Sequence, residues 1–208
     1  MNFTLRSNIK LTIKTSFYLI AASIIFGFVS QFTLNLFNIT LNYISFKDYI
    51  HKDGIYYSIF SYAIVTPLLE ELSFRLWLKY SKINIFISLL STVVLLLKVN
   101  ARLHVYLFAL IALFSIVLMM ESNKIQLSFL WKKYQKIIFS FSCFLFGVCH
   151  IFNFETNSTI LLLSPIITLQ QISMGVILAK VRIKNGIFYS ILPHSIYNFL
   201  IILMESVK

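Results

Sequence analysis

Long apolar runs, separated by short polar stretches, recur from one end of the chain to the other. An α-helix needs about 20 residues to cross the hydrocarbon core of a bilayer, and most of these runs are close to that length. The pattern predicts transmembrane helices over residues 17–37, 56–78, 83–97, 103–120, 137–152, 159–179 and 187–204. Because the third and fifth runs are short, we expect them to tilt, to re-enter the membrane or to extend past these limits.

No spacer rich in Gly, Ser or Pro divides the chain, and no internal repeat is visible in it. We therefore expect one domain over residues 1–208. Its expected fold class is all-α, a polytopic transmembrane helix bundle of about seven spans, within a range of about six to eight.

Composition supports a membrane protein. Hydrophobic residues make up 59% of the chain and charged residues 12%, whereas soluble domains carry about 25% charged residues. This apolar content exceeds what one small core can bury, so lipid must cover the remainder. Cys143 and Cys149 fall in one apolar run without a CxxC pair, which is typical of inert buried thiols.

The formal net charge of +11 does not indicate a nucleic-acid partner, because the basic residues lie in short clusters between the apolar runs. Alternate polar segments hold twelve and five of them. The richer set is Arg6, Lys10, Lys14, Lys79, Lys82, Lys124, Lys132, Lys133, Lys136, Lys180, Arg182 and Lys184, and the poorer set is Lys47, Lys52, Lys98, Arg102 and Lys208. The positive-inside rule then predicts a multi-pass protein of the cell membrane with a cytoplasmic N-terminus, whose first helix is retained rather than cleaved as a signal peptide.

The second apolar run contains three charged residues, which cost about 2.5–3.5 kcal/mol each near the centre of a membrane. Glu71 and Arg75 are four residues apart and can pair on one helical face, whereas Glu70 lies about 100° around the helix. A carboxylate without a partner in a low-dielectric site binds a proton more tightly, as a general base near neutral pH requires. The alternative is a helix end at the interface, with solvated carboxylates and a snorkelling Arg75.

Two other apolar runs carry histidines. His150 ends the run 137–152, and His194 and Asn198 share one face of the run 187–204. Alone, each is also explained by hydrogen bonds between helices or to a backbone carbonyl. Pro67 and Pro193 lie close to these polar groups, and broken helices beside polar groups indicate a water-accessible cavity.

Residue counts from the basic loops predict the depth of each group. Glu70 and His194 both fall about 12–14 Å from the cytoplasmic ends of their helices, at about 1.5 Å per residue. The same count puts His150 at about 21 Å, too deep unless its helix begins later or tilts strongly.

Together these segments resemble the CAAX-protease and bacteriocin-processing (CPBP, or Abi) family of intramembrane proteases, which includes the type II CAAX prenyl proteases. The family pattern is EExxxR, FxxxH and HxxxN or HxxxD, each on a transmembrane helix. Here the three motifs are carried by Glu70, Glu71 and Arg75, by Phe146 and His150, and by His194 and Asn198. All three are complete and in order, which is specific, although each alone is weak.

The resemblance implies an intramembrane endopeptidase that hydrolyses a membrane-associated or prenylated peptide in a site open to the cytoplasm. It implies that Glu70, helped by His150, activates a water. It assigns His194 and Asn198 to the oxyanion and the Glu71–Arg75 pair to bracing the helix.

Whether a metal takes part stays open at this stage. Glu70, His150 and His194 are suitable ligands for zinc or another divalent ion, and the family has been called both metallo-type and glutamate-dependent. Because the chain has no HExxH motif, we expect no obligatory cofactor.

Two other functions compete with peptidase activity. The family includes bacteriocin-immunity proteins, so an immunity or scaffold role without catalysis is the main alternative. A transporter with buried carboxylates and histidines is another, but it predicts inverted repeats that the sequence does not show.

Overall fold

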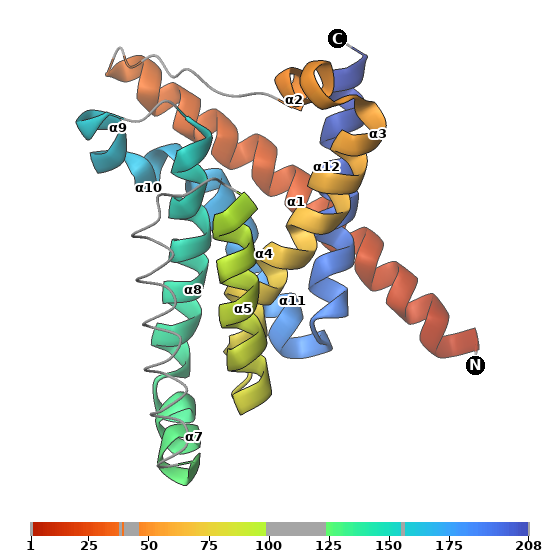
Figure 1. The fold of residues 1–208 in the computed structure, drawn as a ribbon, viewed down its shortest axis with the longest axis vertical. Helices are drawn as coiled ribbons and strands as arrows, with labels where there is room; N and C mark the ends of the chain where they lie inside the picture. The colour runs from red at the N-terminus through yellow and green to blue at the C-terminus, as the bar shows by residue number, and fades with distance from the viewer. Residues whose placement is uncertain (1, 38, 40–45, 99–123, 155–156, 208) are drawn as a thin grey trace.

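The computed structural model describes residues 2–37, 39, 46–98, 124–154 and 157–207, and this part of the chain is all-helical (Figure 1). The helices are α1 (Asn2–Leu36), α2 (Phe46–Asp53), α3 (Ile55–Ser58), η1 (Ile59–Val65), α4 (Thr66–Arg75), η2 (Leu76–Leu78), α5 (Lys82–Lys98), α7 (Lys124–Lys133), α8 (Gln135–Cys149), η3 (His150–Asn153), α9 (Ser158–Leu162), α10 (Ser164–Ile167), α11 (Leu169–Asn185) and α12 (Phe188–Ser206).

Most predicted helices are present with shifted ends. The first begins fifteen residues earlier than expected, at Asn2, and α5 and α12 match the runs 83–97 and 187–204 closely. The short helices α2 and α7 were not expected, because neither is apolar enough to resemble a span. The predicted helix over residues 103–120 lies outside the described residues.

The prediction of a single helix over residues 159–179 is wrong. The structure has three helices there, α9, α10 and α11, and the last continues to Asn185. Pro165 lies in the first turn of α10, where its missing N–H is tolerated, whereas inside a longer helix it would remove a hydrogen bond. Apolar composition alone did not reveal this break.

The second predicted helix, over residues 56–78, is a continuous helical segment whose type changes along its length, from α3 through η1 and α4 to η2. Its central turns, η1, form a π-helix that ends just before Pro67. Thr66 closes the π turn, since its backbone N–H and its hydroxyl both donate to the carbonyl of Ser61. Lys98 also donates to that carbonyl, at 3.1 Å. Pro67 thus marks an irregular helix as predicted, but Pro193 does not interrupt α12.

The ends of the helices divide into two groups along the long axis of the molecule (Figure 1). The start of α1, the α4–α5 turn, α7 and the α11–α12 turn lie towards one end, and the last turn of α12 lies at the other. Lys79, Lys82 and Lys184 are in these two turns or at their edges. The basic loops that the sequence groups together therefore share one end of the structure.

Two tight contacts hold the helices that carry the site. Leu19 of α1 packs with Met174 and Leu178 of α11 and with Tyr197 of α12, all buried. Helix α8 packs against α11 at Gly147, where an added Cβ would lie 2.1 Å from Cγ1 of Ile172 and 2.8 Å from its backbone nitrogen. Small residues permit such close approach between membrane helices.

Replacing Gly147 by Ala is expected to push α8 away from α11, because a backbone atom cannot yield as a flexible side chain does. We expect a loss of about 1–3 kcal/mol in stability and a clear loss of activity, since His150 lies one turn further along. Thermal unfolding of the purified protein measures the first effect. Gly27→Ala is the control, because an added Cβ there would lie 3.1 Å from Oε1 of Gln170, the end of a flexible side chain that can move away. An unchanged melting temperature in Gly147→Ala would contradict the close contact.

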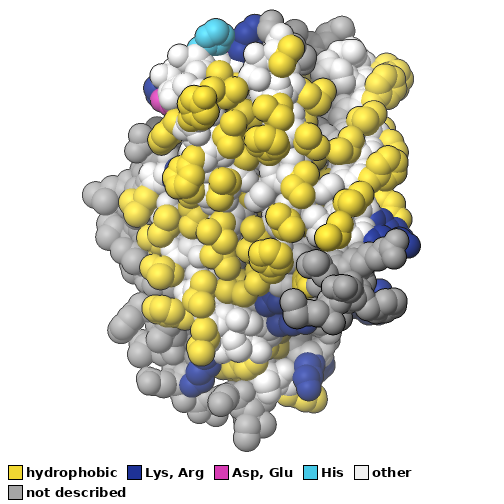
Figure 2. Space-filling model, turned by 90° about the vertical axis from the view of Figure 1, so that its right-hand side faces the viewer, with side chains coloured by type: hydrophobic (Ala, Val, Ile, Leu, Met, Phe, Trp, Pro, Cys, Tyr) yellow, Lys and Arg dark blue, Asp and Glu magenta, His cyan; other side chains and the backbone are white. Residues whose placement is uncertain are grey.

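The outer surface is strongly apolar. Large hydrophobic side chains such as Phe28, Tyr56, Phe60 and Ile83 are more than half exposed, and Figure 2 shows a broad apolar face with Lys and Arg near its edges. Two described helical segments, Ile9–Leu36 and Gln135–Asn153, are long and apolar enough to cross a membrane. This surface is typical of a protein surrounded by lipid.

Candidate active site

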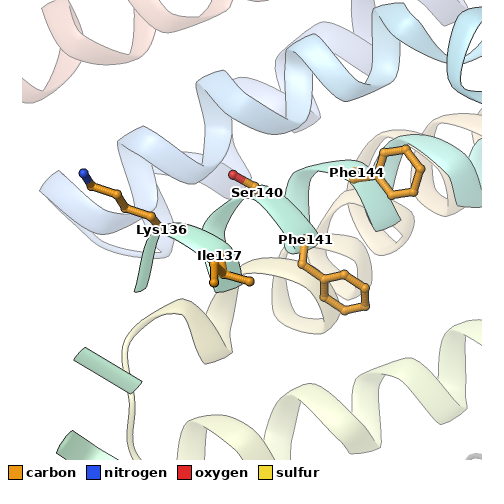
Figure 3. Close-up of a pocket in the computed structure, with 5 residues that line it drawn as sticks. All are labelled: Lys136, Ile137, Ser140, Phe141 and Phe144. Carbon is orange, nitrogen blue, oxygen red and sulfur yellow. The ribbon is translucent and has the colours of Figure 1, made fainter. Parts of the chain in front are cut away.

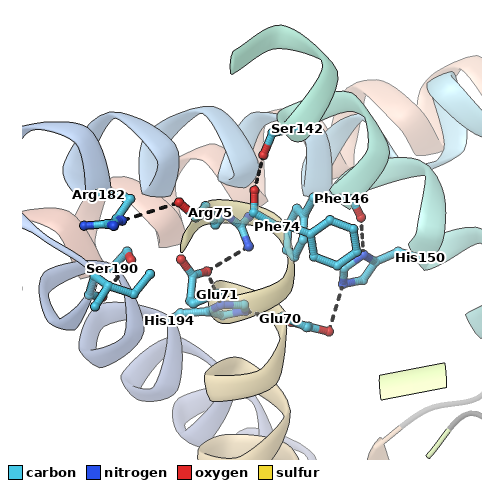
Figure 4. A network of polar contacts seen from close by, with 11 residues as sticks. Glu70, Glu71, Phe74, Arg75, Ser142, Phe146, His150, Arg182, Ser190 and His194 are labelled. Atoms are coloured by element: carbon cyan, nitrogen blue, oxygen red, sulfur yellow. Dashed lines mark hydrogen bonds and ion pairs between the residues drawn. The ribbon is translucent and has the colours of Figure 1, made fainter. Parts of the chain in front are cut away.

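Three helices that are far apart in the sequence bring Glu70, His150 and His194 together (Figure 4). Glu70 projects from α4, His150 from the end of α8 and His194 from α12. One oxygen of Glu70 lies 3.9 Å from Nε2 of His150, and the other lies 3.5 Å from Nε2 of His194. Each carboxylate oxygen therefore faces a different imidazole.

Behind Glu70 lies a sealed cluster of charged groups. Glu71 and Arg75 form the ion pair expected from their spacing, at 2.9 Å, and their side chains are 0% and 1% exposed. The same oxygen, Oε1 of Glu71, lies 2.9 Å from Nδ1 of His194. Because an ionised carboxylate only accepts hydrogen bonds, Nδ1 of His194 carries a proton and donates it.

His150 is oriented by its own helix. Its Nδ1 lies 2.8 Å from the backbone carbonyl of Phe146, so this nitrogen is the donor. The ring of Phe146 packs edge-on against His150, with centroids 4.7 Å apart, and the guanidinium of Arg75 lies 3.7 Å above the same ring. Phe146 thus links the sealed ion pair to the second histidine.

These contacts fix what the two histidines present to Glu70. In both rings Nδ1 is used as a donor, so Nε2 is the atom that faces the carboxylate. A neutral ring then offers a lone pair at Nε2, and an imidazolium offers a second N–H. The site can accept one proton and donate another within a few ångströms.

The depth prediction for His150 is wrong. Helix α7, just before α8, extends beyond the α4–α5 and α11–α12 turns along the long axis (Figure 1), so the basic segments do not all end at one level. Fourteen residues counted from Lys136 therefore end beside Glu70 rather than beyond it. The count assumed that all helices begin at one level.

Exposure to solvent differs between the group formed by Glu70 and His150 and the ion pair behind it. The side chains of Glu70 and His150 are 13% and 20% exposed, whereas Glu71 and Arg75 are sealed. Glu70 and Glu71 are therefore not the solvated carboxylates of a helix end, and Arg75 does not snorkel.

Asn198 has a different environment from the other motif residues. It lies one turn after His194 on α12, and its Nδ2 donates to the backbone carbonyl of Tyr62 at 2.9 Å. This bond holds α12 against the π-helix η1. A carboxamide nitrogen has two N–H groups, and this bond uses one of them.

The arrangement of the possible ligand side chains shows whether they could hold a metal ion. Within the described residues, no group of three His, Cys, Asp or Glu side chains is arranged to hold a metal ion. The donors Glu70, His150 and His194 have suitable chemistry, but this geometry does not form a metal centre.

A shallow depression lies on α8 away from these residues. Lys136, Ile137, Ser140, Phe141 and Phe144 line it along the first half of the helix (Figure 3). Its midpoint is about 15 Å from His150 along α8, at about 1.5 Å per residue. The depression is therefore separate from the cluster of Glu70, His150 and His194.

Several residues around the site were not found from the sequence. Ser88, Ser142 and Arg182 donate to backbone carbonyls at the end of α4. Serines and an arginine near a predicted loop carry no motif, so only the packing of the helices reveals them.

Comparison with known proteins identifies a family whose model covers these residues. Residues 52–200 match the family model described as "Type II CAAX prenyl endopeptidase Rce1-like". That range contains every motif residue named above. No curated protein and no solved structure gives a significant match. The chain belongs to the Rce1-like family of type II CAAX prenyl endopeptidases.

Proposed function

We propose that the protein is a glutamate-dependent intramembrane endopeptidase that cleaves a membrane-associated, prenylated or similar peptide. The observation that carries the proposal is the position of Glu70, whose two oxygens face two oriented imidazoles. Membership of the family supports peptidase activity and a peptide substrate.

The first step is activation of water. Distances of 3.9 Å and 3.5 Å from Glu70 to His150 and His194 are too long for strong hydrogen bonds. They match a single water that bonds to Glu70 and to Nε2 of His150 together. Glu70 accepts a proton from this water as its oxygen attacks the carbonyl carbon of the scissile bond.

The second step is stabilisation of the oxyanion. His194 lies beside two carboxylates, with Glu71 at 2.9 Å and Glu70 at 3.5 Å. When it is protonated at both nitrogens, its ring donates from Nε2 as well as from Nδ1. The Nε2–H of His194 and the second N–H of Asn198 then stabilise the negative oxygen.

The third step is collapse of the tetrahedral intermediate. Glu70 returns its proton to the leaving nitrogen, the C–N bond breaks, and a carboxylate and an amine are released. The ion pair of Glu71 with Arg75 keeps His194 in position throughout, because Glu71 accepts its Nδ1–H.

We propose a multi-pass arrangement of about seven spans, with the N-terminus in the cytoplasm and the site open to that side. The grouping of the α4–α5 and α11–α12 turns with the start of α1 at one end of the structure supports it. The excess of basic residues in these segments gives the same orientation.

A direct test uses the purified protein in lipid nanodiscs with a farnesylated peptide ending in a C-a-a-X sequence. We expect release of the residues after the prenylated cysteine, measured by mass spectrometry. A folded wild-type protein that leaves this peptide intact would contradict the proposed prenyl substrate.

Removal of divalent metal is expected to leave cleavage within about twofold of its initial rate, because no mechanistic step needs a Lewis acid. The measurement is the initial rate after prolonged incubation with EDTA or 1,10-phenanthroline and removal of the chelator. Loss of activity that returns with added zinc would show instead that Glu70 and the histidines act as metal ligands.

A further inference from the structure

Helix α4, which carries Glu70, Glu71 and Arg75, ends inside the protein. Arg75 is its last residue and is 1% exposed, and the chain then tightens into the 3₁₀ turn η2. The last four carbonyls of an α-helix have no partner within the helix. A buried helix end therefore needs donors from elsewhere.

Side chains from three other helices supply these donors. Ser88 of α5 donates to the carbonyl of Leu72 at 2.8 Å, and Ser142 of α8 donates to that of Phe74. From α11, Arg182 donates through Nε to the carbonyl of Arg75 at 3.4 Å and through Nη2 to that of Leu76 at 3.2 Å. Figure 4 shows Ser142 and Arg182 converging on this end.

Arg182 is the unusual member of this group. The sequence places it among the basic residues near a loop, but the structure buries it to 6% exposure. Among the described residues, no carboxylate lies within ion-pair distance of it. The C-terminal end of a helix carries partial negative charge, so the end of α4 provides the compensation that a buried guanidinium needs.

We propose that Arg182 is a positioning residue of the active site, which acts by capping α4 and holding Arg75 in place. This inference rests on the proposed function. The chain of contacts runs from Arg182 to the carbonyl of Arg75, from the Arg75 side chain to Glu71, and from Glu71 to Nδ1 of His194.

A small displacement of Arg182 is passed along this series of contacts to the reacting groups. Glu70 is on the same helix, five residues before Arg75, and His194 is oriented through Glu71. Because catalysis requires placement within fractions of an ångström, a shift of about 1 Å costs about 100-fold in rate. None of the contacts between Arg182 and His194 in this series involves the substrate. The kcat should therefore change more than the KM.

The test compares Arg182→Met, Arg182→Lys and the control Lys184→Met, which removes an exposed charge from the same helix. With the farnesylated peptide, we expect Arg182→Met to lower kcat by about 10- to 100-fold with KM within about twofold. Arg182→Lys keeps the charge and one donor and should recover most of the loss. Lys184→Met should match wild type.

A second readout needs no substrate. Amide hydrogen exchange in nanodiscs should be faster over residues 74–78 in Arg182→Met than in wild type, and unchanged in Lys184→Met. In an Arg75→Lys background, Arg182→Met should lower kcat by clearly less than in wild type, because both changes act through Arg75.

The outcomes separate the two claims. Wild-type kcat and exchange in Arg182→Met would overturn the positioning role, as would losses that are simply additive with Arg75→Lys. Failure of the wild-type protein to cleave the farnesylated peptide would contradict the prenyl substrate of the proposed function, while the exchange data would still decide whether Arg182 caps α4.

Discussion

Replacing Glu70 by Gln is expected to abolish cleavage, with a loss of at least about 10³-fold in kcat/KM. Gln keeps the size of Glu and one acceptor oxygen, but its neutral carboxamide cannot accept a proton from water. The measurement is kcat/KM on the purified protein in nanodiscs. The melting temperature should stay near that of wild type, because Glu70 is not part of the sealed ion pair.

Glu205→Gln provides the matched control for this variant. It makes the same chemical change on α12, eleven residues beyond His194, or about 16 Å along the helix. We expect it to keep wild-type activity. Full activity in Glu70→Gln would show that another group activates the water.

Replacing Arg75 by Met is expected to cost about 3–5 kcal/mol of stability. Glu71 is 0% exposed and would lose the guanidinium that lies 2.9 Å away, leaving a buried carboxylate whose Oε1 keeps only its contact with Nδ1 of His194. Phe146 would also lose the cation over its ring. SDS-induced unfolding in mixed micelles measures the effect.

The double variant Glu71→Gln/Arg75→Met distinguishes a stabilising role from a catalytic one. Removing both charges leaves no uncompensated carboxylate, so most of the stability should return. Activity should not return, because the carboxamide of Glu71→Gln can turn either its oxygen or its NH₂ group towards Nδ1 of His194 and no longer fixes that nitrogen as the donor. An Arg75→Met protein as stable as wild type would contradict the burial of the ion pair.

The sequence predicts that seven motif residues on apolar helices form one site. The structure brings all of them except Asn198 into one cluster of contacts, whereas Asn198 donates to the carbonyl of Tyr62. Intramembrane charges are costly, so their spacing carries information that survives without a structure. The pairing of Glu71 with Arg75 followed from the helical repeat, and the structure shows it directly.

Other features could not be read from the sequence because they depend on how helices are staggered and packed. The predicted depth of His150 was wrong because the basic segments do not all end at one level, with α7 lying beyond the α4–α5 and α11–α12 turns. The run 159–179 contains breaks that hydropathy does not register. Arg182 resembled a loop charge, since only the end of α4 reveals what it binds.

One comparison tests the central claim most directly. Cells expressing equal amounts of wild-type protein or Glu70→Gln are analysed for membrane and secreted peptides by mass spectrometry, without assuming a substrate. We predict at least one peptide whose new terminus appears only with wild type. Identical peptides in both cultures, with both proteins folded in the membrane, would contradict peptidase activity and favour an immunity or scaffold role.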